Sequence, residues 1–384
     1  MMKNLELYFH IPFCLKKCNY CDFLSGEESE FQKREYVRAL LNEIKYQAYD
    51  CEDYEVSSIY FGGGTPSSLK AQVIVELMEQ TRAYFRVRED AEVTVECNPG
   101  TVDREKLALY KMCGVNRLSL GLQSADNQEL HMLGRIHTFE DFLESYDAAR
   151  KAGFENINVD LMSGLPNQTL ATYEKTLKQV IRLKPEHISA YSLIIEKDTP
   201  FYDLYAEDDY LRARGEQPKF LPSEEEERRM YELTKEMLAD NGLFRYEISN
   251  YAKPGYECRH NIGYWRRENY IGMGLGASSL FEHTRFRNTD VLFDYRKGNF
   301  DRMDEEVLSH RSQMEEFMFL GLRMTDGVSR EEFRKNFGIE IDGVYAKPLQ
   351  KLTENGYLEQ KDGRIYFTDE GINVSTTLLT EFML

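Results

Sequence analysis

Residues 10–21 read HIPFCLKKCNYC and decide the fold, because Cys14, Cys18 and Cys21 stand in a C-x3-C-x2-C spacing directly after an apolar segment. Three thiols at this spacing indicate a metal site. Structural zinc takes four protein ligands, and the next cysteine, Cys51, lies beyond a long helical pattern. Thiolates also hold iron–sulfur clusters, and three thiolates on a four-iron cube leave one iron open to a small molecule. The spacing therefore predicts a [4Fe–4S] cluster with one free iron.

The alternative interpretation of the three cysteines is a partial zinc site, or a set of unrelated buried thiols. Cys51, Cys97 and Cys113 stand apart from the cluster of thiols, and we interpret them as small core residues. The predicted metal site therefore has only three thiolate ligands.

Length, charge and cysteine content limit which classes of protein this chain can belong to. The chain has 384 residues, 42% of them hydrophobic, which predicts a sizeable core and two domains. A formal net charge of −18 disfavours nucleic-acid partners, because phosphate backbones repel an acidic surface. We expect neither a signal peptide nor a membrane span, since no apolar run of about 18 residues occurs. Seven cysteines, three of them clustered, predict a reducing cytoplasm rather than a disulfide framework.

Strand and helix patterns alternate six times within residues 1–200. The strand segments are short, apolar and rich in β-branched residues, as buried parallel strands are. Alternation of this kind predicts a parallel sheet with helical crossovers. Six repeats fall short of a closed eight-fold barrel, so we predict an α/β fold with a partial (β/α)6 barrel. Residues 202–220 and 246–270 lack clear periodicity and are predicted to be irregular.

The pattern changes in the last part of the chain. A long helix is predicted from Glu305 to Arg323, followed by two more helices and a hairpin around residues 361–364. Three helices and a hairpin resemble a winged helix, but the segment is acidic, which disfavours duplex binding. We predict a barrel over 1–200, a barrel extension and linker over 201–303, and a small, mostly α, winged-helix-like domain over 304–384.

Polar residues stand at or just beyond the ends of the predicted strands. In parallel barrels the carboxyl ends of the strands carry the chemistry, and a shared ligand explains several polar groups there better than separate salt bridges do. The run from Gly62 to Pro66 lets backbone approach a ligand closely, because no Cβ excludes it. Carboxylates accept ammonium groups and arginine pairs with carboxylates. The other strand-end candidates are Glu96, Gln123, Arg135 and Asp160.

The segment 259–265 reads RHNIGYW and holds the only tryptophan of the chain. A neutral imidazole is a good iron ligand, and neighbouring aromatic side chains suit a flat macrocycle. His260 is therefore a candidate iron ligand, with Cys258 as a second candidate. A structural histidine in an aromatic-rich loop is the alternative that spacing alone favours. No C-x2-C-H motif occurs, which excludes the ordinary c-type attachment.

Together these motifs resemble the radical S-adenosylmethionine (SAM) superfamily and, within it, the oxygen-independent coproporphyrinogen oxidase-like family. True oxidases of that family carry a further cysteine two residues after the third, where Phe23 stands here. The H-N-x-x-Y-W motif at His260 is typical of the HemW-type branch of haem chaperones. The resemblance therefore implies haem binding and delivery rather than decarboxylation. The matching blocks are residues 8–21, 62–66, 95–99, 120–124, 133–137, 158–166 and 260–265.

The resemblance also implies roles for individual residues. Cys14, Cys18 and Cys21 hold the [4Fe–4S] cluster, whose free iron takes the amino and carboxylate groups of SAM, and His260 is the candidate ligand of haem as cargo. The residues expected to contact SAM are Tyr8, Tyr20, Gly63, Gly64, Thr65, Glu96, Gln123, Arg135 and Asp160.

The same resemblance implies partners and a location. The partners are haem, haem-receiving respiratory proteins at the membrane, and an electron donor such as a flavodoxin or ferredoxin. The expected location is the cytoplasm, extending to the inner face of the membrane. The sequence leaves open whether the chain forms a homodimer, whether SAM is cleaved and whether a second SAM binds.

Three functional hypotheses follow from the sequence. The first is a haem chaperone with a radical SAM core. The second is an oxygen-independent coproporphyrinogen III oxidase, which decarboxylates propionate side chains by radical chemistry; Phe23 in place of the fourth cysteine disfavours it. The third is a non-enzymatic zinc protein.

Overall fold

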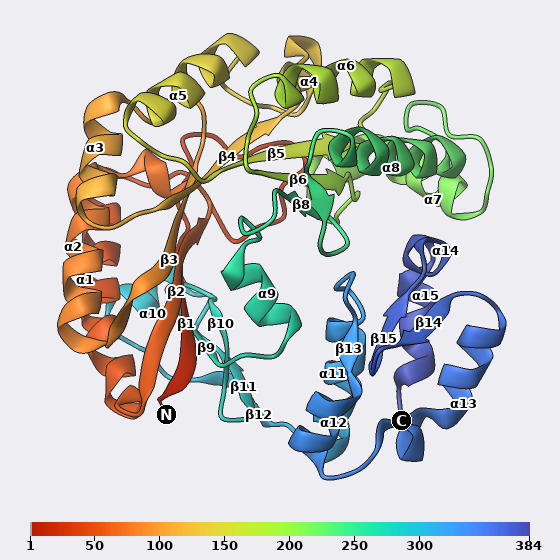
Figure 1. Ribbon diagram of the computed structural model, residues 1–384. Helices are drawn as coiled ribbons and strands as arrows, with labels where there is room; N and C mark the ends of the chain where they lie inside the picture. The colour runs from red at the N-terminus through yellow and green to blue at the C-terminus, as the bar shows by residue number, and fades with distance from the viewer. Residues whose placement is uncertain (1) are drawn as a thin grey trace.

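A curved sheet of twelve strands organises the chain, and the computed structural model describes residues 2–384 (Figure 1). Seven neighbouring strands at its centre, in the order β9 (Tyr270–Met273), β1, β2, β3, β4, β5 and β6, are all parallel. Antiparallel strands extend the sheet at both edges. The first six strands are β1 (Lys3–Ile11), β2 (Tyr54–Gly63), β3 (Val87–Cys97), β4 (Arg117–Gln123), β5 (Ile157–Ser163) and β6 (His187–Ser192).

Helices follow the first strands in turn and cover the convex outer face of the sheet (Figure 1). Ser29, Thr138 and Thr169 each cap a helix through a capping box, which satisfies amide groups that the helix itself leaves free. This alternation confirms the predicted partial (β/α)6 barrel. The covering helices are α1 (Glu30–Gln47), α2 (Ala71–Tyr84), α3 (Arg104–Met112), α4 (Asn127–Met132), α5 (Phe139–Lys151) and α6 (Leu170–Ile181), with short 3-10 turns at Ala48–Cys51 and Pro66–Ser68.

The barrel strands alternate between two kinds of side chain. On β4, Leu118, Leu120 and Leu122 are fully buried in the main hydrophobic core beneath the helices. Arg117 and Ser119, on the opposite face of the same strand, line a cavity inside the barrel. A closed eight-stranded barrel fills its interior with bulky branched side chains. Here the interior is polar, so it suits a polar ligand.

The middle of the chain corrects two predictions of irregular structure. Residues 200–213 form helix α7, which begins at Thr199 as N-cap; it buries only Phe201 and Asp208, so its periodicity is weak. Helix α9 (Arg259–Trp265) lies on the concave side of the sheet and contacts β2 (Figure 1). The other elements of this part are α7 (Pro200–Ala213), α8 (Glu224–Ala239), β7 (Phe244–Arg245), β8 (Asn250–Ala252) and β9 (Tyr270–Met273).

The far edge of the sheet corrects a third prediction. The long helix predicted from Glu305 begins only at His310, capped by Ser309, because residues 303–307 pair with β11 as an exposed edge strand. The elements of this edge are β10 (Ser278–Phe281), β11 (Thr284–Arg287), α10 (Leu292–Arg296) and β12 (Met303–Val307).

The C-terminal part has its own hydrophobic core and a three-stranded sheet in the order β13, β15, β14. Three helices and a hairpin appear as predicted, which gives a small, mostly helical unit. The boundaries expected at residues 200 and 303 stay predictions, since the large sheet itself runs on to β12. Its elements are α11 (His310–Gly321), β13 (Val328–Ser329), α12 (Arg330–Phe337), α13 (Ile341–Glu354), β14 (Leu358–Lys361), β15 (Arg364–Phe367), α14 (Asp369–Asn373), α15 (Ser375–Leu379) and a 3-10 turn at Thr380–Phe382.

Among the helices of residues 2–384, none combines the length and the apolar character that crossing a bilayer requires.

Candidate cluster and cofactor site

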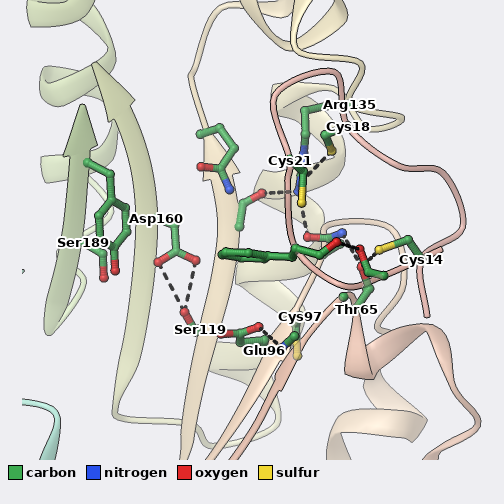
Figure 2. Close-up of a pocket in the computed structure, with 18 of the residues that line it drawn as sticks. Cys14, Cys18, Cys21, Thr65, Glu96, Cys97, Ser119, Arg135, Asp160 and Ser189 are labelled. Atoms are coloured by element: carbon green, nitrogen blue, oxygen red, sulfur yellow. Dashed lines mark hydrogen bonds between the residues drawn. The ribbon is translucent and has the colours of Figure 1, made fainter. Parts of the chain in front are cut away.

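A cavity of about 410 Å³ lies inside the barrel and opens at the carboxyl ends of the strands. Figure 2 shows the sulfur atoms of Cys14, Cys18 and Cys21 on one side of it, with Asp160 and Ser119 on the opposite side. All of the predicted cluster and cofactor residues line this cavity except Tyr8 and His260. The predicted residues that line it are Cys14, Cys18, Tyr20, Cys21, Gly63, Gly64, Thr65, Glu96, Gln123, Arg135 and Asp160.

The loop that carries the cysteines is held in place by backbone hydrogen bonds. The Cys14 amide donates to the Gly26 carbonyl (2.9 Å), and the Gly26 amide donates to the Pro12 carbonyl (2.9 Å). Farther along the loop, the Asn19 amide donates to the Leu133 carbonyl (3.0 Å). These bonds fix the loop above the cavity with all three thiols free and partly exposed.

Two side chains direct donors at the cysteine sulfurs. Arg135 Nη1 donates to Cys18 Sγ at 3.6 Å, and Thr65 Oγ1 donates to Cys14 Sγ at 3.8 Å. Burial raises the pKa of Cys21, so a thiolate there needs a compensating cation. Donors of this kind stabilise cluster-bound thiolates. The chemistry of the donor set therefore fits an iron–sulfur cluster.

The spacing of the three thiols bears on the zinc alternative. Across residues 2–384, no three His, Cys, Asp or Glu side chains come close enough to hold one metal ion. The described residues therefore contain no ready-made site for a single zinc ion.

The glycine run packs directly beneath the cysteine loop. A Cβ on Gly64 would come within 2.8 Å of the Phe13 carbonyl oxygen and 2.9 Å of its amide nitrogen. The Gly64 amide donates to the Ile11 carbonyl (2.8 Å) and the Thr65 amide to the Phe13 carbonyl (2.8 Å). Gly63 has a φ of +111°, a conformation that side chains disfavour. The run is thus required for the close approach of the two loops.

Glu96 places a buried carboxylate in the cavity wall. It accepts hydrogen bonds from the Tyr60 hydroxyl (2.9 Å) and from the Gly63 amide (3.2 Å). Burial, together with the charge of Asp160, raises the pKa of Glu96 to about 7. A cationic ligand would favour the ionised form, because an opposite charge lowers the pKa of a carboxyl group. Glu96 is therefore suited to an ammonium or sulfonium group.

Asp160 and Arg135 are held by neighbouring polar groups. Asp160 accepts from the Ser119 hydroxyl (3.1 Å) and from Asn158 Nδ2 (2.7 Å), and burial raises its pKa. Arg135 Nη2 donates to Asn98 Oδ1 (2.7 Å) and to the Gly121 carbonyl (2.6 Å). Both side chains are pre-oriented toward the cavity before any ligand arrives.

Tyr8 and His260 lie outside the cavity lining. The Tyr8 hydroxyl is 3.1 Å from His10 Nδ1. His260 is 1% exposed, and its ring nitrogens are paired: Nδ1 with the Ser58 hydroxyl (2.8 Å) and Nε2 with the Tyr264 hydroxyl (2.9 Å). Burial lowers the pKa of His260 to about 3, so the ring is neutral. In this arrangement neither nitrogen is open to a haem iron.

Several cavity residues were not predicted from the sequence. They project inward from positions that precede the carboxyl ends of the strands. Their signal was the alternation of polar and apolar residues along each strand, as in RLSLGLQ at 117–123. The cavity residues missed in this way include Tyr60, Arg117, Ser119, Asn158, Ser189 and Tyr191.

Comparison with known proteins decides the family. The family model of the Radical SAM superfamily matches residues 8–180, and that of the HemN C-terminal domain matches residues 308–374. The chain is 38% identical to the heme chaperone HemW of Bacillus subtilis over 95% of each chain. It is 35% identical to HemW of Escherichia coli over 99% of this chain and 98% of that one. The chain belongs to the HemW family of the radical SAM superfamily.

HemW membership agrees with the fold. The structure of the coproporphyrinogen III oxidase HemN from Escherichia coli, described as a radical SAM enzyme, superposes with a TM-score of 0.83. That match covers 100% of this chain and 90% of HemN at 24% sequence identity, so it shows the fold alone. Membership of the radical SAM superfamily implies a [4Fe–4S] cluster and SAM as cofactors.

Proposed function

We propose that the protein is a haem chaperone that binds a [4Fe–4S] cluster and SAM in its barrel and delivers haem to respiratory haem proteins. The observation that carries the proposal is the similarity to HemW chaperones over almost the full chain. In this proposal Cys14, Cys18 and Cys21 hold the cluster, and the other predicted residues that line the cavity hold SAM.

The rim of the cavity supports a cargo that is flat and apolar. Phe23, at the position where the oxidases of the family carry a cysteine, is 61% exposed and lines the cavity. Leu15, in the same loop, and Ile136, after α4, are also exposed and line a small adjoining pocket. Exposed apolar side chains that lie close together are typical of a binding surface. Phe23 in place of a fourth thiol favours haem handling over the oxidase reaction.

Haem ligation by His260 requires a local change. Because the Tyr264 hydroxyl occupies Nε2 and the Ser58 hydroxyl occupies Nδ1, one of these bonds must open before iron can bind. The partner of Nε2 is Tyr264, which lies on the same short helix, α9, as His260. We infer that haem binding displaces Tyr264 from His260.

Two variants test this proposal. His260→Ala should weaken haem binding at least tenfold, whereas Tyr264→Phe, which removes the competing hydroxyl, should keep it or strengthen it. Haem binding is measured by absorbance titration on cluster-loaded protein, with iron and sulfide content as the control for an intact cluster. Unchanged haem affinity in the His260→Ala protein would remove His260 as ligand, and no haem binding by the unmodified protein would remove the chaperone function.

The two other hypotheses have direct assays. Anaerobic incubation with coproporphyrinogen, SAM and a reductant should give no decarboxylated product; product would establish the oxidase. Stoichiometric zinc without sulfide after anaerobic purification would establish the zinc protein.

Partners and location complete the proposal. We expect haem transfer to respiratory proteins at the inner face of the membrane, a flavodoxin or ferredoxin as electron donor, and a cytoplasmic protein that reaches the membrane only at its surface. Sedimentation of the cluster-loaded protein with and without haem tests for a homodimer.

A further inference from the structure

The barrel cavity contains a charged side chain that the proposed cofactors do not use. We propose that Arg117, at the floor of the cavity, binds a carboxylate group, which belongs either to a propionate side chain of haem or to a separate small acid. The identification of the carboxylate as a haem propionate rests on the proposed chaperone function. The carboxylate site itself rests on the geometry of the barrel.

Arg117 is buried and faces the cavity. It is the first residue of β4, is 1% exposed, and lines the cavity on the same face of the strand as Ser119 and Gln123. Strand residues two apart point to the same face, whereas Leu118 between them packs in the hydrophobic core. The guanidinium is therefore directed into the barrel, not toward the helices.

The Arg117 side chain makes no hydrogen bond and no ion pair with any residue in the described range 2–384, and its buried Nε has no acceptor. Arg135, the other arginine of the cavity, donates to Asn98, to the Gly121 carbonyl and to Cys18. Arginine stays charged in proteins, and a buried charge without a partner is unfavourable. The contrast between the two arginines indicates that the partner of Arg117 is a ligand.

The acidic side chains nearby are already engaged. Glu92 accepts from the amides of Arg259 (3.2 Å) and His260 (3.3 Å), at the start of helix α9. Glu96 accepts from Tyr60 and Gly63, and Asp160 accepts from Ser119 and Asn158. None of the three lies within 4.0 Å of the guanidinium as an ion pair in the described chain. They surround Arg117 without neutralising it directly.

A neighbouring hydroxyl is also free. Thr94 of β3 pairs in register with Arg117, and its buried Oγ1 has no hydrogen-bond partner among the residues that the structure describes. A guanidinium pairs with a carboxylate through two parallel N–H···O bonds, and a hydroxyl can donate a further one. Thr94 is not among the residues that line the cavity, so Arg117 is the donor that a carboxylate in the cavity would meet first.

The depth of Arg117 separates this site from the cluster. Arg117 and Gln123 mark opposite ends of β4, and six steps of about 3.3 Å place their Cα atoms about 20 Å apart. The cysteine loop lies at the Gln123 end. A SAM carboxylate held next to the cluster would stay at the upper end of the cavity, so the ligand of Arg117 is a second carboxylate.

Propionate is the probe for this site. We expect cluster-loaded, full-length protein with SAM bound to show saturable binding of 13C-carboxyl propionate by NMR, and no binding of the neutral isostere propionamide. Arg117→Gln should weaken propionate binding at least tenfold. Arg117→Lys keeps the positive charge but loses the paired N–H donors of the guanidinium, so it should weaken binding less. Lys16→Gln is the matched control, because it removes a cation from the cavity rim only and should leave propionate affinity unchanged.

Thermal unfolding separates a binding role from a structural one. Propionate should raise the melting temperature of the wild type, and Arg117→Met should abolish that rise. An equal rise in both proteins would show that propionate binds elsewhere and would overturn the proposal. Equal propionate affinity in Arg117→Gln and wild type would overturn it as well.

Haem and its dimethyl ester identify the source of the carboxylate. If the wild type binds the ester more weakly than haem and Arg117→Gln binds both equally, the carboxylate belongs to haem. If the wild type binds both equally while propionate still requires Arg117, it belongs to a separate small acid. Failure of haem to bind at all would refute the chaperone function and would leave the propionate result to stand on its own.

Discussion

The pKa of Glu96 makes SAM binding dependent on pH. Burial and the charge of Asp160 raise the pKa of this carboxyl group to about 7, and only its ionised form can pair with a cationic group of SAM. The ionised fraction rises with pH, so affinity should rise with it. Between pH 6 and pH 8 the fraction changes about tenfold, which corresponds to about 1.4 kcal/mol of binding free energy.

Glu96→Gln is the perturbation that isolates this effect. The amide cannot ionise, while its carbonyl oxygen can still accept from Tyr60 or Gly63. We expect its SAM affinity at pH 8 to fall about tenfold, to the level that the wild type shows at pH 6. Equilibrium dialysis of labelled SAM against cluster-loaded protein at pH 6, 7 and 8 measures both proteins.

The test compares the SAM affinity of the wild type with that of Glu96→Gln, as a ratio at each pH. Groups of SAM that titrate in this range affect both proteins equally, so they cancel in this ratio. That ratio should grow about tenfold from pH 6 to pH 8. A ratio that stays constant across this range would refute the assignment of Glu96 as a buried carboxylate that pairs with SAM.

Three further predictions concern the loops and the core. Gly64→Ala should at least halve the iron and sulfide content after reconstitution, because its Cβ meets the Phe13 backbone at 2.8 Å; full content would show that the loops can separate. Burial lowers the pKa of His260 to about 3, below its unfolded value of about 6.5, so its stabilising contribution is present above pH 6.5 and lost below it. His260→Asn should therefore reduce the loss of stability between pH 6.5 and pH 5 by about 2 kcal/mol, as measured by urea unfolding of cluster-free protein; an unchanged loss would contradict the burial of a neutral ring. Leu120→Ala should cost about 2–5 kcal/mol in the same assay, and a loss below 1 kcal/mol would place Leu120 outside the core.

Short sequence patterns predicted the structure well where a residue type has only one structural role at that spacing. The cysteine spacing is such a short-range pattern, and in the structure all three cysteines line one cavity. Weakly amphipathic helices were missed. Helix α7 packs only two residues, and α9 is short, so neither has a clear period.

The site residues at the strand ends could be predicted from the sequence, because parallel strands bring their carboxyl ends to one edge of the sheet. The inward-facing residues farther down the strands could not be predicted, because the sequence does not say whether a polar residue faces a cavity or a neighbouring helix. Arg117 reads in the sequence as the polar start of a strand. Only the structure shows that none of the described residues, 2–384, pairs with its side chain.

The sequence by itself determined the family, the alternation of strands and helices, and the loop of three cysteines, because each depends on spacing along the chain. The tertiary structure decided which polar side chains share the cavity and that His260 is paired at both ring nitrogens. It also showed that no residue in the range 2–384 pairs with the Arg117 side chain. Those properties depend on which strands become neighbours and on what lies across the barrel from each side chain. A sequence pattern records neither.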